Sequence, residues 1–368
     1  MGVWIVILIV SLSSSLVGII YLTATVTRFP FMEKLAKGKK WLKILLSLGI
    51  VLVSFLVIMK VLSMTNAIVI FLGAFLIRLI LGILGAIIKK IRKKPFKYYW
   101  QGWGALVLLI LYFSVAYFIA HNVVATQYNL TTDKHIGNLR VAMFADSHMG
   151  TTFDAEGFEK NMDKLMEYNP DILLIVGDYV DDSTTKEDMI KASEVLGTLN
   201  PKYGVWYAIG NHDRGYNRAE EKSFDEKELV KALMDNGVGI LVDETVLIDD
   251  RFYLVGREDA YYSDREDISG LTADLDKEIY SIVMDHQPTD YANEAAAGVD
   301  LVLSGHTHGG QLFPVNHVGD WFKINDRTYG YERRDNTDFI VTSGISSWEI
   351  PFKTGTQSEF VIIDISGK

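Results

Sequence analysis

Residues 139–150 read LRVAMFADSHMG, an apolar run that ends directly in the polar cluster Asp146, Ser147 and His148. Four more apolar runs in the second half of the chain end in the same way: ILLIV before GDYVD (177–181), VWYAI before GNHD (210–213), SIVMD before His286, and LVLS before GHTHGG (305–310). Amphipathic stretches such as 156–168 and 186–199 lie between several of these runs. Alternating strands and helices at this spacing predict an α/β layered fold. Functional side chains in such sheets collect at the carboxyl ends of the strands, so we expect the five clusters to meet.

The five clusters contain five of the chain's eight histidines. Each cluster alone is typical of turn chemistry. Together the clusters contain many carboxylates and imidazoles, and burying so many of these groups is costly unless their charge and polarity are compensated. Bound cations would provide that compensation. The chain has no cysteine, which excludes disulfides, thiolate zinc sites and iron–sulfur clusters. Imidazole, carboxylate and amide ligands suit Mn, Fe or Zn, and their number here is enough for two ions with one bridging carboxylate.

Charge divides the chain into two unlike halves. Residues 1–121 hold 14 basic residues and one acid, Glu33, whereas 122–368 hold 22 basic and 45 acidic residues. The net charge of −10 therefore describes neither half. A strongly acidic second half counts against a nucleic-acid partner, because binding to the phosphate backbone needs basic side chains.

The basic half contains four apolar stretches, at 1–27, 44–64, 67–88 and 103–120. Each is close to the roughly 20 residues that cross a bilayer core. A cleavable signal peptide is the alternative for the first stretch, but it would need a positively charged start, which is missing. These stretches carry no paired acids and no proline breaks, so an anchor is favoured over a transporter. We expect a four-span transmembrane domain (1–121), a linker (122–138) and a soluble domain (139–368).

Basic residues predict the orientation in the membrane. Twelve Lys and Arg side chains lie in the loops 26–43 and 89–102, against about one on the other side. Short loops rich in Lys and Arg stay in the cytoplasm. With four spans, this places everything after Ala120 on the extracytoplasmic side; the competing view keeps the soluble domain in the cytoplasm.

The order Asp-x-His, Gly-Asp-x-x-Asp, Gly-Asn-His-Asp, His, Gly-His-x-His resembles the calcineurin-like metallophosphoesterase superfamily over roughly 138–366. The segments GHTHGGQ (305–311) and 344–351 are similar to a bacterial, often membrane-associated subgroup. Lys353 departs from the subgroup, which tends to carry Arg there. The resemblance implies a four-layer α/β/β/α sandwich, here preceded by the four-helix transmembrane segment.

The resemblance also implies roles for the clustered residues. It assigns Asp146, His148 and His308 to one metal, assigns Asn211, His286 and His306 to a second, and makes Asp178 the bridge. His212 would act on the substrate as an acid or a charge stabiliser, with Asp213 orienting its ring and Asp181 supporting the bridging loop. Their positions near the metal loops make Tyr216 and Arg218, and Gln311 and Phe313 of the aromatic stretch 311–331, candidate substrate-rim residues. The resemblance adds Lys353 as a suspected substrate contact.

We therefore expect a membrane-anchored phosphoesterase with two divalent ions, Mn²⁺ favoured and Fe or Zn as alternatives. A metal-bridged hydroxide would attack the phosphate ester, and a phosphodiester is preferred over a monoester. The expected substrate is lipid-linked or belongs to the cell envelope, because an anchor concentrates lipid-borne molecules. The alternatives are a phosphoesterase for soluble nucleotides or sugar phosphates, and a catalytically weak metal-dependent binding or sensing module.

Overall fold

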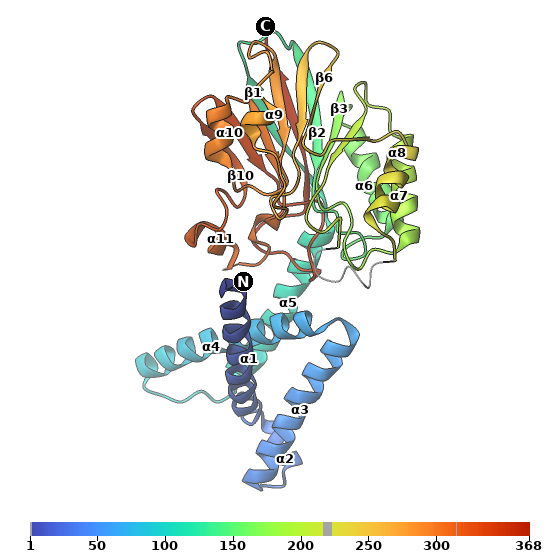
Figure 1. Cartoon of the computed structure of the whole chain (residues 1–368). Helices are drawn as coiled ribbons and strands as arrows, with labels where there is room; N and C mark the ends of the chain where they lie inside the picture. The colour runs from blue at the N-terminus through green and yellow to red at the C-terminus, as the bar shows by residue number, and fades with distance from the viewer. Residues whose placement is uncertain (1, 216–222, 314) are drawn as a thin grey trace. The chain divides into compact units, whose positions relative to one another are not determined.

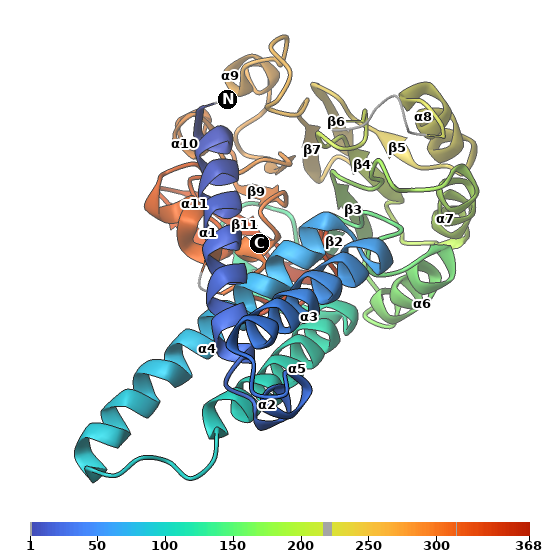
Figure 2. The ribbon, with the colours of Figure 1, turned by 90° about the horizontal axis from the view of Figure 1, so that it is seen from below.

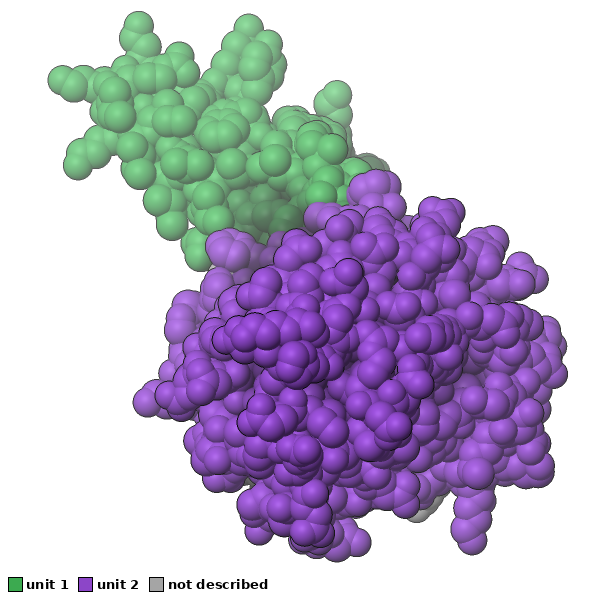
Figure 3. All heavy atoms as spheres, turned by 90° about the horizontal axis from the view of Figure 1, so that it is seen from above, with its two compact units in different colours: residues 1–115 green, residues 116–368 purple. Residues whose placement is uncertain are grey.

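The computed structural model describes residues 2–215, 223–313 and 315–368, which form two compact units, 1–115 and 116–368 (Figure 3). The first unit is helical (Figure 1). Its helices, with the last one continuing into the second unit, are α1 (Gly2–Val26), α2 (Pro30–Leu35), α3 (Lys40–Val61), α4 (Met64–Arg92) and α5 (Trp100–His121). Three of these, α3, α4 and α5, are long and apolar enough to cross a membrane, and the apolar Leu16–Val26 belongs to α1.

Two sets of polar contacts hold the helices of the first unit in place: an N-terminal cap on α4 and a hydrogen-bonded arginine within it. The Ser63 hydroxyl accepts a hydrogen bond from the Asn66 backbone N–H and so begins α4 immediately after α3 ends. The buried Arg78 guanidinium of α4 donates to the Tyr99 hydroxyl at 3.1 and 2.9 Å. Tyr99 in turn donates to the Thr25 carbonyl at 3.1 Å. Arg78, a charge in the middle of a predicted span, is thereby paired with other groups of its own unit, as buried charges require.

The second unit contains two six-stranded mixed sheets. The first sheet has, in spatial order, β1 (Val124–Thr131), β12 (Glu359–Ser366), β2 (Asn138–Phe144), β3 (Ile172–Val176), β4 (Val205–Ala208) and β5 (Gly239–Ile240). The second sheet has β10 (Gly330–Arg334), β11 (Thr337–Val341), β9 (Leu301–Ser304), β8 (Tyr280–Met284), β7 (Phe252–Gly256) and β6 (Glu244–Ile248). The five apolar runs that precede the polar clusters form β2, β3, β4, β8 and β9, as predicted.

Helices cover the outer face of each sheet. In the views of Figures 1 and 2, α6 (Ala155–Met166), α7 (Lys186–Thr198) and α8 (Glu226–Asp235) lie side by side against the first sheet. The second sheet is covered by α9 (Ile268–Leu271) and α10 (Tyr291–Ala297). Helices α6, α7 and α8 each begin at a side-chain cap, which is Asp154, Thr185 and Asp225 respectively.

Three apolar cores separate the four layers. Phe158 of α6 packs with Phe144 of β2 between the helices and the first sheet. Met143 and Met284 belong to the core between the two sheets. Tyr291 of α10 stacks on Phe339 of β11 at 3.9 Å on the far side of the second sheet. This arrangement is the α/β/β/α sandwich that the sequence predicts.

Strand β1 lies within residues 122–138, which the sequence analysis treats as an unpatterned linker. β1 runs parallel to β12, with Val124 opposite Glu359 and Thr131 opposite Ser366. It is the edge strand of its sheet, and most of its side chains are half-buried or exposed. An edge strand of this kind lacks the alternation of apolar and polar residues that reveals a strand in a sequence. Only two residues, Asn122 and Val123, separate it from the end of α5.

Candidate metal centre

The clustered side chains follow five strands at the point where each strand ends. Asp146 and His148 follow β2, Asp178 follows β3, and Asn211 and His212 follow β4. Strands β2, β3 and β4 are parallel neighbours, so their carboxyl ends share one edge of the first sheet. His286 follows β8, and His306 and His308 follow β9, a second parallel pair in the other sheet. The topology thus brings both sets of loops to one place, as open α/β sheets do at their functional sites.

The first group consists of Asp146, His148 and His308, whose ligand atoms all lie within 4.8 Å of one another. All three side chains are buried. Oδ1 of Asp146 lies 3.9 Å from Nε2 of His148 and 3.6 Å from Nε2 of His308. The Asp146 carboxylate also accepts the His306 backbone N–H at 3.0 Å, which ties the β2 loop to the β9 loop.

The second group consists of Asp178, His286 and His306. Oδ2 of Asp178 lies 3.1 Å from Nε2 of His286, and the same oxygen lies 3.6 Å from Nε2 of His148 in the first group. Asp178 therefore stands between the two groups. Asn211 is buried, and its amide oxygen has no hydrogen-bond partner among the described residues. An unpaired buried oxygen is costly unless a cation or another donor compensates it.

The hydrogen-bond partner of Nδ1 in each histidine ring decides whether Nε2 is the nitrogen available to bind a metal. Nδ1 of His286 lies 2.8 Å from the Val176 carbonyl and donates its proton there, so Nε2 is the nitrogen left for a metal. Burial lowers the pKa of this ring, but the adjacent Asp178 carboxylate outweighs it and raises the pKa, so a cation would displace a proton from Nε2. Nδ1 of His148 lies 3.4 Å from a carboxylate oxygen of Asp181, and Nδ1 of His308 lies 3.4 Å from the Ser346 carbonyl. Oriented in this way, the Nε2 atoms of His148 and His308 face each other at 3.1 Å. Without a cation, the proton that His148 holds joins these two nitrogens as a hydrogen bond. A divalent cation can take its place by accepting the lone pairs of both nitrogens, so these residues fit a metal.

Backbone strain accompanies this geometry. Five residues of the two groups have positive φ: Asp146 (56°), His148 (33°), Asp178 (51°), His306 (68°) and His308 (50°). Non-glycine residues rarely adopt this conformation, which is concentrated at functional sites where the surrounding structure enforces it.

Two glycines allow the loops to approach the clustered side chains. A Cβ atom at Gly177 would overlap the His286 ring, and one at Gly210 would overlap the Asp178 carboxylate. The glycines in the Gly-Asp and Gly-Asn-His-Asp clusters are therefore required by close packing.

Burial and neighbouring charge shift the pKa values of the cluster in opposite directions. Burial raises the pKa of the Asp146 carboxyl to about 6. Burial by itself would lower the pKa of His148, but hydrogen bonding to Asp181 and the nearby carboxylates outweigh it and raise the pKa to about 9. Burial lowers the pKa of His306 to about 3, so that ring is neutral at physiological pH. Without a cation, His148 holds a proton at neutral pH, and a cation that binds there displaces it.

The carboxylate beside the His212 ring is that of Asp181. Its Oδ1 lies 3.2 Å from Nδ1 of His212, while its other oxygen faces His148. The sequence analysis instead gives Asp213 this position. The Asp213 carboxylate accepts the backbone N–H groups of Asp178 at 2.9 Å, Val180 at 3.0 Å and Gly210 at 2.7 Å. Asp213 thus holds the β3 and β4 loops together.

The side chains of His148, Asp181 and His212 form a third group close enough to hold an ion. In this group the two rings present Nδ1 to opposite oxygens of one carboxylate, the arrangement of two N–H donors on a shared acceptor. We interpret it as the hydrogen-bonded support of the two rings.

One buried acid near the centre is missing from the sequence analysis. Asp259 follows β7, and its carboxylate accepts the Gln287 side-chain amide at 2.7 Å and the Tyr261 N–H at 2.8 Å. Burial raises the pKa of Asp259 to about 6, although the adjacent charge of His286 lowers it. The sequence does contain the pattern that could identify Asp259: the apolar run YLVG at 253–256 ends in the polar cluster Arg-Glu-Asp, as the other runs end in polar clusters.

The His286 loop is anchored by a buried ionic network. The Arg257 guanidinium contacts Asp285 at 2.9 Å, Asp290 at 2.8 Å and Glu294 at 3.4 Å, and Arg265 also pairs with Asp285. Because Asp285 directly precedes His286, this network fixes the backbone that carries the ring.

Of the residues predicted to form the substrate rim, only some lie where an exposed rim residue would lie. Tyr216 and Arg218 lie outside the described residues. Phe313 is 61% exposed, as a rim residue would be. The Gln311 side-chain amide instead donates to the carbonyls of Trp348, Ile350 and Phe352, at 3.1, 3.0 and 3.3 Å, and so shapes a loop.

Lys353 does not lie on the rim. It is wholly buried and donates to the carbonyls of Ser343 and Gly344. Gly344 in turn packs against Asp146, where an added Cβ would lie 2.7 Å from the Asp146 Cβ. A buried ammonium satisfied by backbone carbonyls is a support behind the site, and this role accepts lysine in place of arginine.

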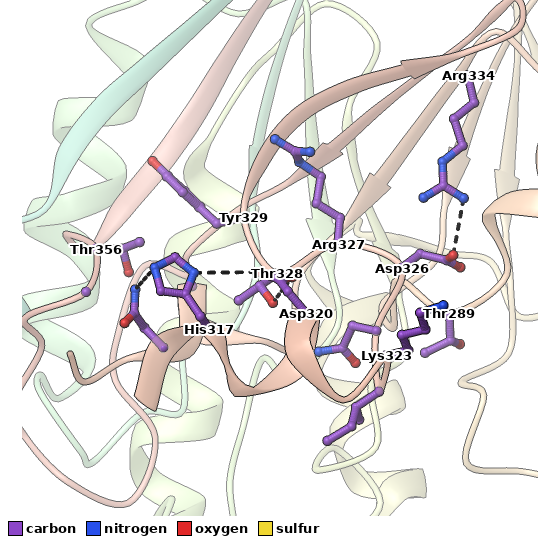
Figure 4. Close-up of a pocket in the computed structure, with 15 residues that line it drawn as sticks. Thr289, His317, Asp320, Lys323, Asp326, Arg327, Thr328, Tyr329, Arg334 and Thr356 are labelled. Atoms are coloured by element: carbon purple, nitrogen blue, oxygen red, sulfur yellow. Dashed lines mark hydrogen bonds and ion pairs between the residues drawn. The ribbon is translucent and has the colours of Figure 1, made fainter. Parts of the chain in front are cut away.

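A polar pocket of about 890 Å³ lies beside the β9 loop (Figure 4). Gly309, which follows His308, lines it together with Lys323, Arg327, Tyr329 and Thr356. The Thr307 hydroxyl donates to the Thr328 carbonyl at 2.6 Å and connects the loop of His306 and His308 to the pocket wall. The pocket therefore lies next to the loop that carries His306 and His308, and its lining residues do not include the candidate metal ligands.

Residues 139–310 match a family model described as calcineurin-like phosphoesterase. An uncharacterised metallophosphoesterase of Campylobacter jejuni is 31% identical over 274 residues, which cover 72% of this chain and 70% of that protein. A transmembrane protein with a metallophosphoesterase domain from Danio rerio is 29% identical over 62% of this chain, and the match spans about half, 53%, of the fish protein. Among solved structures, TT1561 of Thermus thermophilus matches 55% of this chain and 88% of its own, with 13% identity and a TM-score of 0.36.

Proposed function

We propose that this chain, which belongs to the calcineurin-like metallophosphoesterase superfamily, uses two divalent metal ions to hydrolyse a phosphodiester that is lipid-linked or part of the cell envelope. The observation that carries the proposal is the facing pair of Nε2 atoms of His148 and His308, 3.1 Å apart, with Asp178 between this group and the next. A divalent cation bound by both rings would replace the proton that otherwise joins these two nitrogens.

We assign the metal ligands as two sets that share one residue. The first set is Asp146, His148 and His308; the second is Asn211, His286 and His306; Asp178 bridges them. Mn²⁺ is our first choice and Fe or Zn the alternatives, since the donors are imidazole, carboxylate and amide without thiolate. When bound, the two ions would supply Lewis-acid chemistry that activates water and offsets the charge of the phosphoryl group.

His212 has the catalytic role in this proposal. Its ring is buried, and Nδ1 faces Asp181 at 3.2 Å, so the carboxylate fixes the orientation of the ring. Nε2 would give its proton to the leaving oxygen of the ester. Asp213 supports the reaction by holding the backbone of the β3 and β4 loops, on which Asp178 and His212 lie.

The anchor favours a lipid-borne substrate, because it confines the site to the membrane surface. We propose the division into a transmembrane domain (1–121), a linker (122–138) that includes β1, and a phosphoesterase domain (139–368). Two other functions remain as alternatives. The chain could hydrolyse soluble nucleotides or sugar phosphates, or it could be a catalytically weak metal-dependent binding or sensing module.

Metal analysis and a substrate panel test the proposal on the purified full-length chain. We expect about two divalent ions per chain, loss of activity after chelation and recovery after addition of Mn²⁺. Phosphodiesters and phosphomonoesters with chromogenic leaving groups should be compared, together with a phospholipid ester in vesicles. A protein that binds metal but hydrolyses none of these esters would support the sensing alternative, and a protein that binds no metal would contradict the assignment.

We further propose that the phosphoesterase domain lies on the extracytoplasmic side. Support comes from the basic loops 26–43 and 89–102, since positively charged short loops remain in the cytoplasm. The prediction is that protease added to intact, wall-stripped cells degrades the C-terminal domain. A cytoplasmic protein serves as the control for cell integrity. Protection of the domain until the cells are lysed would place it in the cytoplasm instead.

A further inference from the structure

Four large apolar side chains are exposed together at the edge of the second unit. They are Phe313 (61% exposed), Trp321 (68%), Phe322 (71%) and Ile324 (47%), and we call them the apolar patch. The patch lies on and around α11 (Val318–Trp321). In the described part of 122–368, the other exposed large apolar side chains lie apart in the sequence: Ile190, Met234, Leu247, Tyr261 and Tyr331. Four exposed large apolar side chains within residues 313–324 are a concentration that marks a contact with another body.

The patch is connected to the end of the last apolar helix. Within the second unit, the backbone N–H of Lys353 donates to the Ala116 carbonyl of α5 at 3.0 Å, and the Ser358 hydroxyl donates to the Ala120 carbonyl at 2.7 Å. The residue after Lys353 reaches the patch, because the Thr354 hydroxyl accepts the Phe313 N–H at 2.9 Å. One short segment, 353–358, therefore binds both the end of α5 and the base of the patch.

The end of α5 is itself apolar and exposed. Tyr117 and Phe118 are 50% and 63% exposed, and the helix is one of those able to span a membrane. Segment 353–358 links Phe313 of the patch to this helix end, where α5 would reach the headgroup level of the bilayer. Trp and Phe are favoured at that level, where the acyl chains meet the headgroups.

A basic residue lies beside the apolar patch, as expected for a surface that contacts lipid headgroups. The exposed Lys323 stands between Phe322 and Ile324 and also lines the pocket of Figure 4. Lysine beside inserted aromatics suits an interface in which phosphate groups lie just above the acyl boundary. The same pocket reaches Gly309, next to His308.

We propose that the apolar patch inserts into the headgroup–acyl boundary of the bilayer that holds the chain, giving the second unit its own contact with the membrane. This contact goes beyond the proposed function, since it exists whether or not the centre is catalytic. It holds the mouth of the pocket at the level of the lipid headgroups.

The absence of cysteine makes a direct depth measurement feasible. The full-length chain carrying Phe322→Cys is labelled with a nitroxide and reconstituted into phosphatidylcholine–phosphatidylglycerol vesicles. Its matched control is Met234→Cys on α8, a side chain that is 62% exposed. We expect the label at 322 to collide mainly with oxygen, which concentrates in the bilayer, and the label at 234 to collide mainly with a water-soluble nickel complex.

Equal, water-like collision profiles at both positions would overturn the proposal. A second label at Ile324→Cys repeats the measurement should the first variant fold poorly. Spin–spin broadening that disappears on dilution with unlabelled protein would show that a second copy of the chain covers the patch, and would also overturn it. None of these readings depends on phosphoesterase activity, so failure of the proposed function and failure of this contact are separable.

Discussion

Replacing Asp178 with alanine or asparagine should lower turnover by about a thousandfold or more and remove metal from both positions. The reason is that Oδ2 of Asp178 lies within reach of both groups, 3.1 Å from His286 and 3.6 Å from His148. Metal ions supply several kcal/mol of transition-state stabilisation, and each 1.36 kcal/mol corresponds to about tenfold in rate. Metal content per chain and kcat on the best ester of the panel are the two measurements.

Two controls separate loss of metal from loss of fold. The asparagine variant keeps an oxygen that can accept the His212 N–H, which donates to Oδ1 of Asp178 at 2.9 Å, so the backbone of the loop is preserved. The exposed Asp274→Ala removes a carboxylate from the surface and should change neither reading. An Asp178→Asn protein that still holds two metals and turns over normally would show that this residue is not the shared ligand.

Replacing His212 with glutamine should reduce kcat by about 10²–10⁴-fold while both metals stay bound. His212 belongs to neither of the two main groups, and its ring is supported by Asp181 at 3.2 Å. A general acid matters most when the leaving group is a poor one. We therefore expect a large loss with an alkyl ester and a small one with a nitrophenyl ester, whose leaving group departs without a proton.

The leaving-group comparison also distinguishes a purely structural His212. A variant that loses the same factor with both esters would have lost the geometry of the site, and one that loses metal would place His212 among the ligands, in the group with His148 and Asp181. Asp181→Asn is the matched second variant. It should reproduce part of the same leaving-group dependence, because it weakens the support of the protonated ring.

The sequence predicts the residues at the strand ends because each metal-ligating residue type directly follows an apolar run that forms a strand. An apolar run followed at once by Asp, Asn or His predicts a loop at a sheet edge, and Asp146, Asp178 and His286 all lie at such positions in the structure. Asp259 follows the same rule after β7, although its cluster Arg-Glu-Asp lacks the glycine that precedes Asp178 and Asn211.

Contacts between distant residues could not be derived in this way. Asp181 and Asp213 are both carboxylates in loops that follow neighbouring strands, and only the path of the backbone decides which of them faces His212. The burial of Lys353 depends likewise on the carbonyls of Ser343 and Gly344, which no periodicity reveals. Strand β1 went unseen because an edge strand with one exposed face carries little apolar pattern.

The two-residue connection between α5 and β1 limits how far the phosphoesterase domain can travel. Asn122 and Val123, fully extended, span at most about 7 Å. The Ser358 hydroxyl also donates to the Ala120 carbonyl of α5, which further limits the movement that this connection allows. The end of α5 and β1 belong to the same compact unit, and a connection of this length leaves the catalytic loops little freedom to move away from that helix end. Encounter would then depend mainly on diffusion of the substrate. Inserting a flexible ten-residue spacer at 122 would enlarge the searched volume, and any dependence of turnover on spacer length would measure how strongly that confinement governs encounter.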